Sequence, residues 1–263
     1  VEISYPGVTI SRIEQVENPN YQFIYLKLDD NVNPDMVNIN FKEGKLKKTI
    51  PFELKRRSKT TYKGFNASDD IYLITPDRFA NGNTANDSVK GLYQGVNRSK
   101  PFSRHGGDIQ GIINQLDYIQ NLGMTALWIN PLTENNQPEF SYHGYAITDF
   151  YKVDARFGSN EDFKKLTDLC HQRNMKMIID LVFNHCGNEH WFIKDLPEKN
   201  WIHQFDTFTQ SNYRLATTAD PHASQFDKEK MEKGWFDRHM PDLNQENPRL
   251  ATYLIQNTIW WIE

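Results

Sequence analysis

Short apolar segments alternate with longer amphipathic ones after Asp70, and this alternation is the feature that most limits how the chain can fold. The apolar segments, residues 71–75, 125–129 and 175–182, have the composition of strands. Residues 108–123, residues 161–173 and those from 247 onwards follow the helical period. Alternating strands and helices form parallel βαβ units, so the pattern predicts the α/β class. Because residues 175–182 are nearly all apolar, we expect a strand that is buried on both faces.

The beginning of the chain has a different pattern, typical of antiparallel sheets. Residues 8–13, 21–28, 36–41 and 46–52 are short, rich in β-branched and aromatic side chains, and separated by turn residues. This spacing predicts part of an immunoglobulin-like β-sandwich, which has about seven strands when complete.

These patterns predict the division of the chain into domains. We expect a partial β-sandwich over residues 1–57, a polar linker over residues 58–69, and the α/β part over residues 70–263. About 60 residues separate the third predicted strand from its helix, which is too long for an ordinary connection. The sequence therefore predicts an inserted subdomain at about residues 186–244.

Composition argues against two classes of protein. The chain has 30 Lys and Arg against 34 Asp and Glu, a net charge of -4, whereas nucleic-acid binders usually need a basic face. No window approaches the roughly 18 apolar residues that span a bilayer, so we expect no membrane span. The two cysteines, Cys170 and Cys186, do not make a disulfide framework, and we expect free thiols.

Three polar clusters follow the predicted strands, at residues 81–87, 142–145 and 180–185. In a barrel of alternating strands and helices, functional loops lie at the C-terminal ends of the strands. Clusters that meet at one rim indicate a site. Taken alone, His143 and His185 could be ordinary loop histidines, and Tyr145 could serve packing only.

The motifs in these clusters resemble those of a known family. Residues 180–185, Asp-Leu-Val-Phe-Asn-His, resemble the first signature region of the α-amylase family of glycoside hydrolases. Residues 142–145, Tyr-His-Gly-Tyr, followed by Asp149 and residues 157–158, resemble the segment after that family's second barrel strand. Residues 240–244, Met-Pro-Asp-Leu-Asn, resemble the form typical of neopullulanases, cyclomaltodextrinases and maltogenic amylases. Together these motifs are specific, whereas each one alone is modest.

The resemblance implies a fold and a set of site residues. From about Asp70 onwards the chain would form the first three βα units of a (β/α)8 TIM barrel, preceded by part of the subgroup's β-sandwich. Tyr145 would stack on the sugar ring beside the scissile bond, and His143 and His185 would hydrogen-bond to that sugar. Asp180 and Asn184 would lie behind them, with Asp180 holding an arginine of the fourth strand.

The resemblance also implies a structural calcium ion. Calcium takes about six to eight oxygen ligands, and the spacing around residues 81–87 resembles a calcium loop of this subgroup. Asn83 departs from the Asp that this loop carries among relatives, and the departure removes one negative charge. Asn, Asp and Gly are also turn residues, and Asp108 could simply cap its helix. The predicted metal ligands are Asn81, Asn83, Asn86, Asp87, Gly106 and Asp108.

The residues that would perform catalysis are not in this sequence. A retaining glycosidase needs two carboxyl groups about 5 Å apart. In the α-amylase family the nucleophilic Asp stands in a Gly-x-Arg-x-Asp pattern on the fourth strand, and this pattern does not occur here. We therefore expect the nucleophilic Asp, the acid Glu and a stabilising Asp beyond Glu263, in a longer parent enzyme. The 263-residue piece alone is predicted to be inactive.

Three functions compete. The first is an enzyme whose parent form hydrolyses α-1,4-glucosidic bonds in cyclodextrins, maltooligosaccharides or pullulan by a retaining double displacement. The alternative is a non-catalytic α-glucan-binding module, and the third is a structural subunit. The expected partners are α-glucan oligosaccharides or cyclodextrins, and the resemblance also suggests a homodimer. The absent initiator Met is typical of a processed periplasmic or secreted protein, but a cytoplasmic location also fits.

Overall fold

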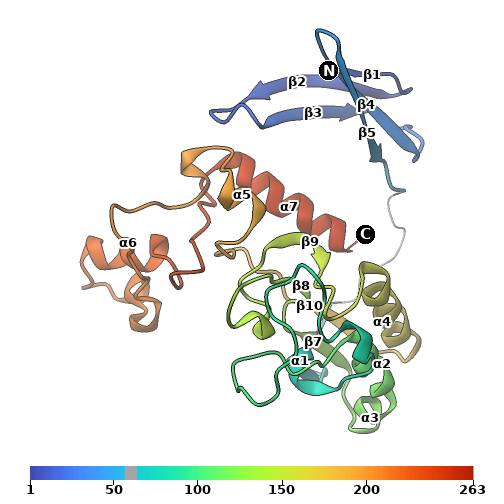
Figure 1. Cartoon of the computed structure of the whole chain (residues 1–263), viewed down its shortest axis with the longest axis vertical. Helices are drawn as coiled ribbons and strands as arrows, with labels where there is room; N and C mark the ends of the chain where they lie inside the picture. The colour runs from blue at the N-terminus through green and yellow to red at the C-terminus, as the bar shows by residue number, and fades with distance from the viewer. Residues whose placement is uncertain (57–63, 263) are drawn as a thin grey trace. The chain divides into compact units, whose positions relative to one another are not determined.

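The structure, a computed structural model, describes residues 1–56 and 64–262. Backbone contacts divide the chain into two compact units (Figure 1). Among the described residues, the first comprises residues 1–56 and Leu196–Lys199, and the second comprises residues 64–195 and Asn200–Ile262. The first half of the predicted linker, residues 58–63, lies outside the described residues.

The first unit contains two antiparallel sheets, as expected for part of a β-sandwich. One sheet has the strand order β1-β4-β5 and the other pairs β2 with β3. Val8, Val37 and Leu54 are buried and form its small core. Strand β1 was not predicted, because a strand of two residues leaves no periodic signal in the sequence. The strands are β1 (Glu2–Ile3), β2 (Val8–Gln15), β3 (Gln22–Leu28), β4 (Met36–Glu43) and β5 (Leu46–Glu53).

The second unit is built on a parallel sheet with the strand order β10-β7-β6. Its strands are β6 (Ile71–Ile74), β7 (Ala126–Ile129) and β10 (Lys176–Ile179), and each lies within a predicted strand segment. Ile74, Leu127 and Ile129 are buried in the core that the sheet shares with its helices. A separate antiparallel pair, β8 (Thr133–Glu134) with β9 (Asp149–Val153), lies in the connection between β7 and the helix that begins at Asn160.

The expectation that the third strand is buried on both faces is wrong for the described chain. All four residues of β10 are only partly buried, whereas three of the four residues of β7 are buried. The reason is position, since β10 lies at the edge of the described sheet and β7 lies in its centre. An apolar sequence indicates that a strand can be buried, but it does not indicate which neighbouring strands and helices cover it.

Helices cover this sheet much as the periodicity predicts, with one interruption. The predicted helix over residues 108–123 is divided into α2 (Ile109–Asn114) and α3 (Leu116–Asn121). Gln115 leaves the helical region at φ −108° and ψ 9°, and its N–H bonds to the carbonyl of Ile112. The apolar face still continues across the break, so periodicity alone could not reveal it. The other core helices are α4 (Asn160–Gln172), beside α2, and α7 (Pro248–Ile262) (Figure 1).

The segment between β10 and α7 contains short elements that return to the strand end. Residues of its beginning and end pair as isolated bridges, His185 with Asp242 and Ile202 with Leu243. It includes α5 (Trp191–Lys194) and α6 (Gln225–Lys233), and the short helix α1 (Pro76–Phe79) follows β6. Across the part of the chain that is described, no helix combines the length and the apolar character that a membrane crossing requires.

The N-terminus of α4 provides a test of the local structure. The Ser159 hydroxyl accepts the Asp162 N–H at 3.1 Å, and the Asp162 carboxylate accepts the Ser159 N–H at 2.9 Å. We expect Ser159→Ala to lower the free energy of unfolding by about 1 kcal/mol, because one helix N–H loses its acceptor. Ser159→Thr keeps the acceptor and should retain most of the stability. Urea denaturation measures both, and equal midpoints for Ser159→Ala and the wild type would contradict the assignment.

Candidate functional site

Asp180 connects residues from three segments at the C-terminal end of the parallel sheet. It directly follows β10, and its Oδ2 accepts the Tyr145 hydroxyl at 2.9 Å and the Trp128 indole N–H at 3.2 Å. The pKa of Tyr145 is raised to about 12, mainly because the side chain is buried and secondly because its hydroxyl donates to Asp180. Tyr145 therefore stays protonated and acts as a donor at neutral pH. Trp128 was missed by the sequence analysis, which treated it only as a strand residue.

His143 lies on a 3₁₀ turn, Ser141–His143, that brings it beside Tyr145. Its Nδ1 accepts the backbone N–H of Tyr145 at 2.9 Å, and the two rings lie 5.9 Å apart. A neutral imidazole that accepts at Nδ1 carries its proton on Nε2, so Nε2 is a donor. Gly144 has φ +85°, and a Cβ there would lie 2.2 Å from the carbonyl oxygen of Pro131, so only glycine fits this turn.

His185 enters the same rim from the loop after β10. Its Nδ1 lies 3.1 Å from the side-chain nitrogen of Asn184, which can donate to it and leave the proton on Nε2. The imidazole stacks on Phe236 at 4.8 Å, and Phe236 stacks on Tyr213 at 5.0 Å. These two rings come from the segment between β10 and α7. No spacing in the sequence connects them to His185, which explains why they were missed.

Both imidazoles are held in the neutral form. Burial is the main cause that lowers the pKa of His143 to about 4, and the charges of His239 and His185 add to it. Burial also lowers the pKa of His185 to about 4, although the backbone of Tyr145 partly offsets this effect. At neutral pH the rim thus presents a phenol and uncharged imidazoles beside the Asp180 carboxylate. Such groups donate to hydroxyls, and the aromatic faces suit the apolar face of a sugar ring.

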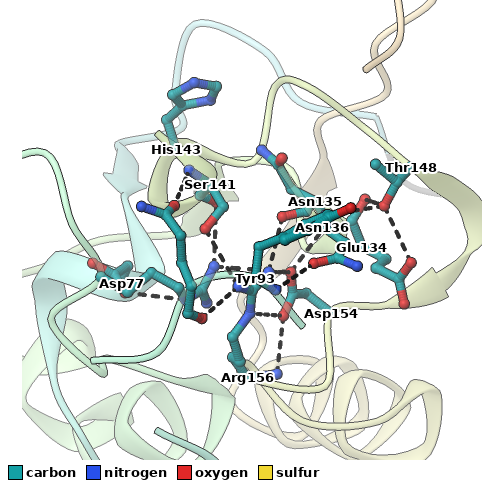
Figure 2. A network of polar contacts seen from close by, with 12 residues as sticks. Asp77, Tyr93, Glu134, Asn135, Asn136, Ser141, His143, Thr148, Asp154 and Arg156 are labelled. Atoms are coloured by element: carbon teal, nitrogen blue, oxygen red, sulfur yellow. Dashed lines mark hydrogen bonds and ion pairs between the residues drawn. The ribbon is translucent and has the colours of Figure 1, made fainter. Parts of the chain in front are cut away.

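A buried network of ionic groups supports the turn that carries His143 (Figure 2). Arg156 binds Asp154 through two parallel hydrogen bonds of 2.8 and 2.7 Å, from Nε and Nη2. Arg104 lies 3.8 Å from Asp154 and 3.7 Å from Asp77, and it donates to the Ser141 carbonyl at 3.2 Å. All four charged side chains are almost completely buried.

The charges of this network compensate one another. Burial alone would raise the pKa of Asp154, but Arg104 and Arg156 outweigh it and lower the pKa. Burial lowers the pKa of Arg104 to about 10, which still leaves it charged at neutral pH. The sequence analysis missed this network, because its members lie far apart and match no functional spacing. Only Asp154 and Arg156 are close in the sequence, two residues apart.

The structure brings the predicted metal ligands into one loop cluster. The Asn81 amide donates to Asp87 at 2.7 Å, and a Cβ at Gly106 would lie 2.7 Å from the Asp87 Oδ1. Asp108 caps α2 by accepting the Gly111 N–H at 2.6 Å, as its alternative interpretation proposed, and it also accepts the Asn83 N–H at 2.8 Å.

Two amide oxygens of this cluster remain unpartnered. The Oδ1 atoms of Asn81 and Asn86 are buried, and neither has a hydrogen-bond partner among the described residues. Among those residues there is also no group of three or more His, Cys, Asp or Glu placed to hold a metal ion. The donors of this loop are mainly amide, carboxylate and carbonyl oxygens, the ligands that a hard cation such as calcium prefers.

Comparison with known families identifies the fold. Residues 73–263 match the model for the alpha amylase catalytic domain, and residues 1–58 match the model for the cyclomaltodextrinase N-terminal domain. The chain therefore belongs to the α-amylase family of glycoside hydrolases, and it combines part of the (β/α)8 barrel with part of an N-terminal β-sandwich.

Individual relatives agree with this assignment. A beta/alpha-amylase of Paenibacillus polymyxa is 37% identical over 200 residues, covering 74% of this chain and 16% of the relative. A cyclomaltodextrinase of Geobacillus thermopakistaniensis is 33% identical over 192 residues, covering 73% of this chain and 31% of the relative. The solved α-amylase of Geobacillus thermoleovorans complexed with acarbose is 38% identical with a TM-score of 0.58, covering 74% of this chain and 37% of that one. The chain thus spans about a third or less of the length of these two curated relatives.

The buried network predicts a large difference between two changes at basic residues. Arg156→Lys keeps the charge but loses the bidentate hydrogen bonds to Asp154, so we expect the free energy of unfolding to fall by about 3 kcal/mol. Lys164→Met removes an exposed pair with Asp168 and should change it by less than about 0.5 kcal/mol. Denaturant titration of both variants checks this, and similar losses for the two would refute the role of the network.

The lowered pKa values of His143 and His185 predict the direction of a pH effect. Because the unfolded imidazoles titrate near pH 6.5 and the folded ones near 4, the unfolded state binds more protons in this interval. Stability should therefore be fully present above pH 6.5 and decrease as the pH falls towards 4. NMR titration of the imidazole C–H signals measures the folded values directly, with the same titration in denaturant as the reference. Folded-state midpoints at or above 6.5 would contradict the burial argument.

Proposed function

We propose that the protein containing this chain hydrolyses α-1,4-glucosidic bonds in cyclodextrins, maltooligosaccharides or pullulan, with retention of configuration. The observation that carries the proposal is the arrangement around Tyr145. Its hydroxyl is anchored by Asp180, its backbone N–H is bound by His143, and both contacts fix the ring at the end of the sheet. Membership of the α-amylase family and the similarity to a cyclomaltodextrinase support the reaction and the substrate class.

Each residue of this rim has a proposed task. The Tyr145 ring stacks on the sugar next to the bond that is cleaved, and His143 and His185 donate from Nε2 to its hydroxyls. Asp180 positions Tyr145 and Trp128, and Asn184 positions His185 through Nδ1. The neutral imidazoles suit this task because a hydroxyl group is uncharged.

The covalent steps need groups that this chain does not supply in the family's pattern. In a retaining mechanism a carboxylate attacks the anomeric carbon while a carboxylic acid protonates the leaving oxygen, and water then hydrolyses the glycosyl ester. We assign these roles to an Asp and a Glu of the longer protein, with a further Asp as stabiliser. The 263-residue chain would bind the sugar without cleaving it.

The configuration of the first product tests the reaction. The full-length protein is mixed with maltooligosaccharide, and proton NMR follows the anomeric signals from the first minute. We expect the α-anomer to appear first and to mutarotate afterwards, as retention requires. A first product with the β-configuration would contradict retention. Binding of cyclodextrin without any release of reducing sugar would favour the non-catalytic α-glucan-binding module instead.

Variants at Tyr145 test the assignment of the site. Tyr145→Ala removes the stacking surface, and we expect kcat/KM to fall by at least about a hundredfold, since both binding and orientation are lost. Tyr145→Phe keeps the ring and loses only the hydrogen bond to Asp180, so it should retain most of the binding and a larger share of the activity. If both variants matched the wild type, Tyr145 would not lie at the substrate.

We also propose that the loop cluster around Asp87 binds a structural calcium ion. The unpartnered oxygens of Asn81 and Asn86 support a cation there, together with the carboxylate of Asp87. The remaining proposed ligands are Asn83, the Gly106 carbonyl and Asp108. An ion of this kind would hold the loop against α2 and supply no chemistry to the reaction.

Removal of the metal tests this site. At calcium concentrations about a hundred times the Kd, binding stabilises the folded state by about 3 kcal/mol, so EDTA should lower the melting temperature. Asp87→Asn removes the charge that favours the ion and should largely abolish the difference between calcium and EDTA. Identical melting curves for the wild type in calcium and in EDTA, with no metal in elemental analysis, would exclude the site.

A further inference from the structure

A tight turn places His239 at the rim of the candidate site. Asp237 and Met240 pair across this turn, and the Met240 N–H bonds to the Asp237 carbonyl at 2.9 Å. The carbonyl of His239 accepts the Asn188 N–H at 2.9 Å, which fastens the turn to the loop that follows His185. The charge of His239 lowers the pKa of both His143 and His185, as expected for three imidazoles that face one region.

The Nε2 atom of His239 has no hydrogen-bond partner among the described residues, and neither has the Nε2 atom of His185. Both atoms are also shielded from solvent. A buried polar atom without a partner destabilises the folded state, so its presence at the rim of the candidate site points to a ligand. A sugar hydroxyl both donates and accepts, and it would satisfy either nitrogen.

Phe140 adds an aromatic surface beside His239. Its ring stacks on the imidazole at 6.3 Å with an angle of 30°, and the edge of Phe102 lies 5.7 Å away. Phe140 is 37% exposed and Phe102 is 61% exposed, so this aromatic group is open to solvent on part of its surface. Exposed phenyl rings clustered beside unpartnered imidazole nitrogens fit a carbohydrate better than they fit a charged ligand.

The backbone of Phe140 is strained in the same place. Its φ is +59° and its ψ is 18°, the left-handed conformation that a bulky side chain rarely adopts. Such strain persists only where the surroundings impose it, and it gathers at ligand sites. Here the next residue, Ser141, is held on both sides, by Gln94 at its N–H and by Arg104 at its carbonyl.

We propose that Phe140 and His239 form a second sugar-binding surface, which contacts a further glucose unit of the same α-glucan chain and selects longer substrates. Phe140 stacks on the apolar face of that glucose, and the Nε2 atom of His239 binds one of its hydroxyls. This inference rests on the proposed function, because it extends the same site along the substrate. It makes the turn at Asp237–Met240 an element that determines specificity.

The test compares short and long substrates in the full-length protein. Phe140→Asn removes the ring, while Asn tolerates the left-handed backbone, so the turn should persist and the melting temperature should not fall. We expect kcat/KM for maltohexaose to fall about tenfold, the equivalent of one lost stacking contact, and kcat/KM for maltotriose to stay within about twofold. Phe140→Tyr keeps the ring and should match the wild type with both substrates.

Two further variants complete the test. His239→Phe keeps the aromatic stack but removes the nitrogen, and it should also reduce activity on maltohexaose selectively. Phe226→Ala removes an exposed ring of α6 and should change neither substrate. The inference would be overturned if the ratio of kcat/KM for maltohexaose to kcat/KM for maltotriose were the same in Phe140→Asn as in the wild type, whether both values were unchanged or both fell by the same factor. A wild-type protein that cleaves neither substrate would instead refute the proposed function.

Discussion

The paired hydrogen bonds between Arg156 and Asp154 are the interaction on which the site depends. They neutralise a carboxylate that would otherwise be buried at high cost, and they place Arg104 where it can bind the Ser141 carbonyl. Ser141 begins the turn that carries His143 and, two residues later, Tyr145. An almost completely buried charged network thus supports the turn that carries two side chains of the candidate site. Because the network is fully buried, its members cannot change independently without leaving an uncompensated charge.

Residues of the segment between β10 and α7 also position a side chain of the candidate site from far along the chain. Phe236 lies flat against His185, and Tyr213 lies against Phe236, so the plane of a rim imidazole is set by rings from far along the chain. His239 reaches the rim from the same segment. Parallel strands provide the fixed edge, in the form of Asp180 after β10 and Trp128 on β7. The long connection supplies the opposite wall, which carries Tyr213, Phe236 and His239.

The sequence predicted elements whose signals are local and missed those that depend on partners. Periodicity located the three parallel strands and α4, because a period and a cap are properties of neighbouring residues. Motif resemblance singled out Tyr145, His143, His185 and Asp180, which the structure brings to one rim, and their roles in binding remain predictions. The break at Gln115, the partial exposure of β10 and the contacts of Arg104 depend on packing between distant segments. No period or spacing encodes such contacts, so they could be found only once the chain was folded.

A crystal structure of the full-length protein with acarbose would show whether the rim around Tyr145 binds the α-glucan. We expect one ring of the inhibitor to stack on Tyr145, with hydroxyls within hydrogen-bond distance of the Nε2 atoms of His143 and His185. We also expect that the Tyr145 hydroxyl still donates to Asp180 in the complex. An inhibitor bound elsewhere, with Tyr145 and both imidazoles out of contact, would show that this rim is not the glucan site.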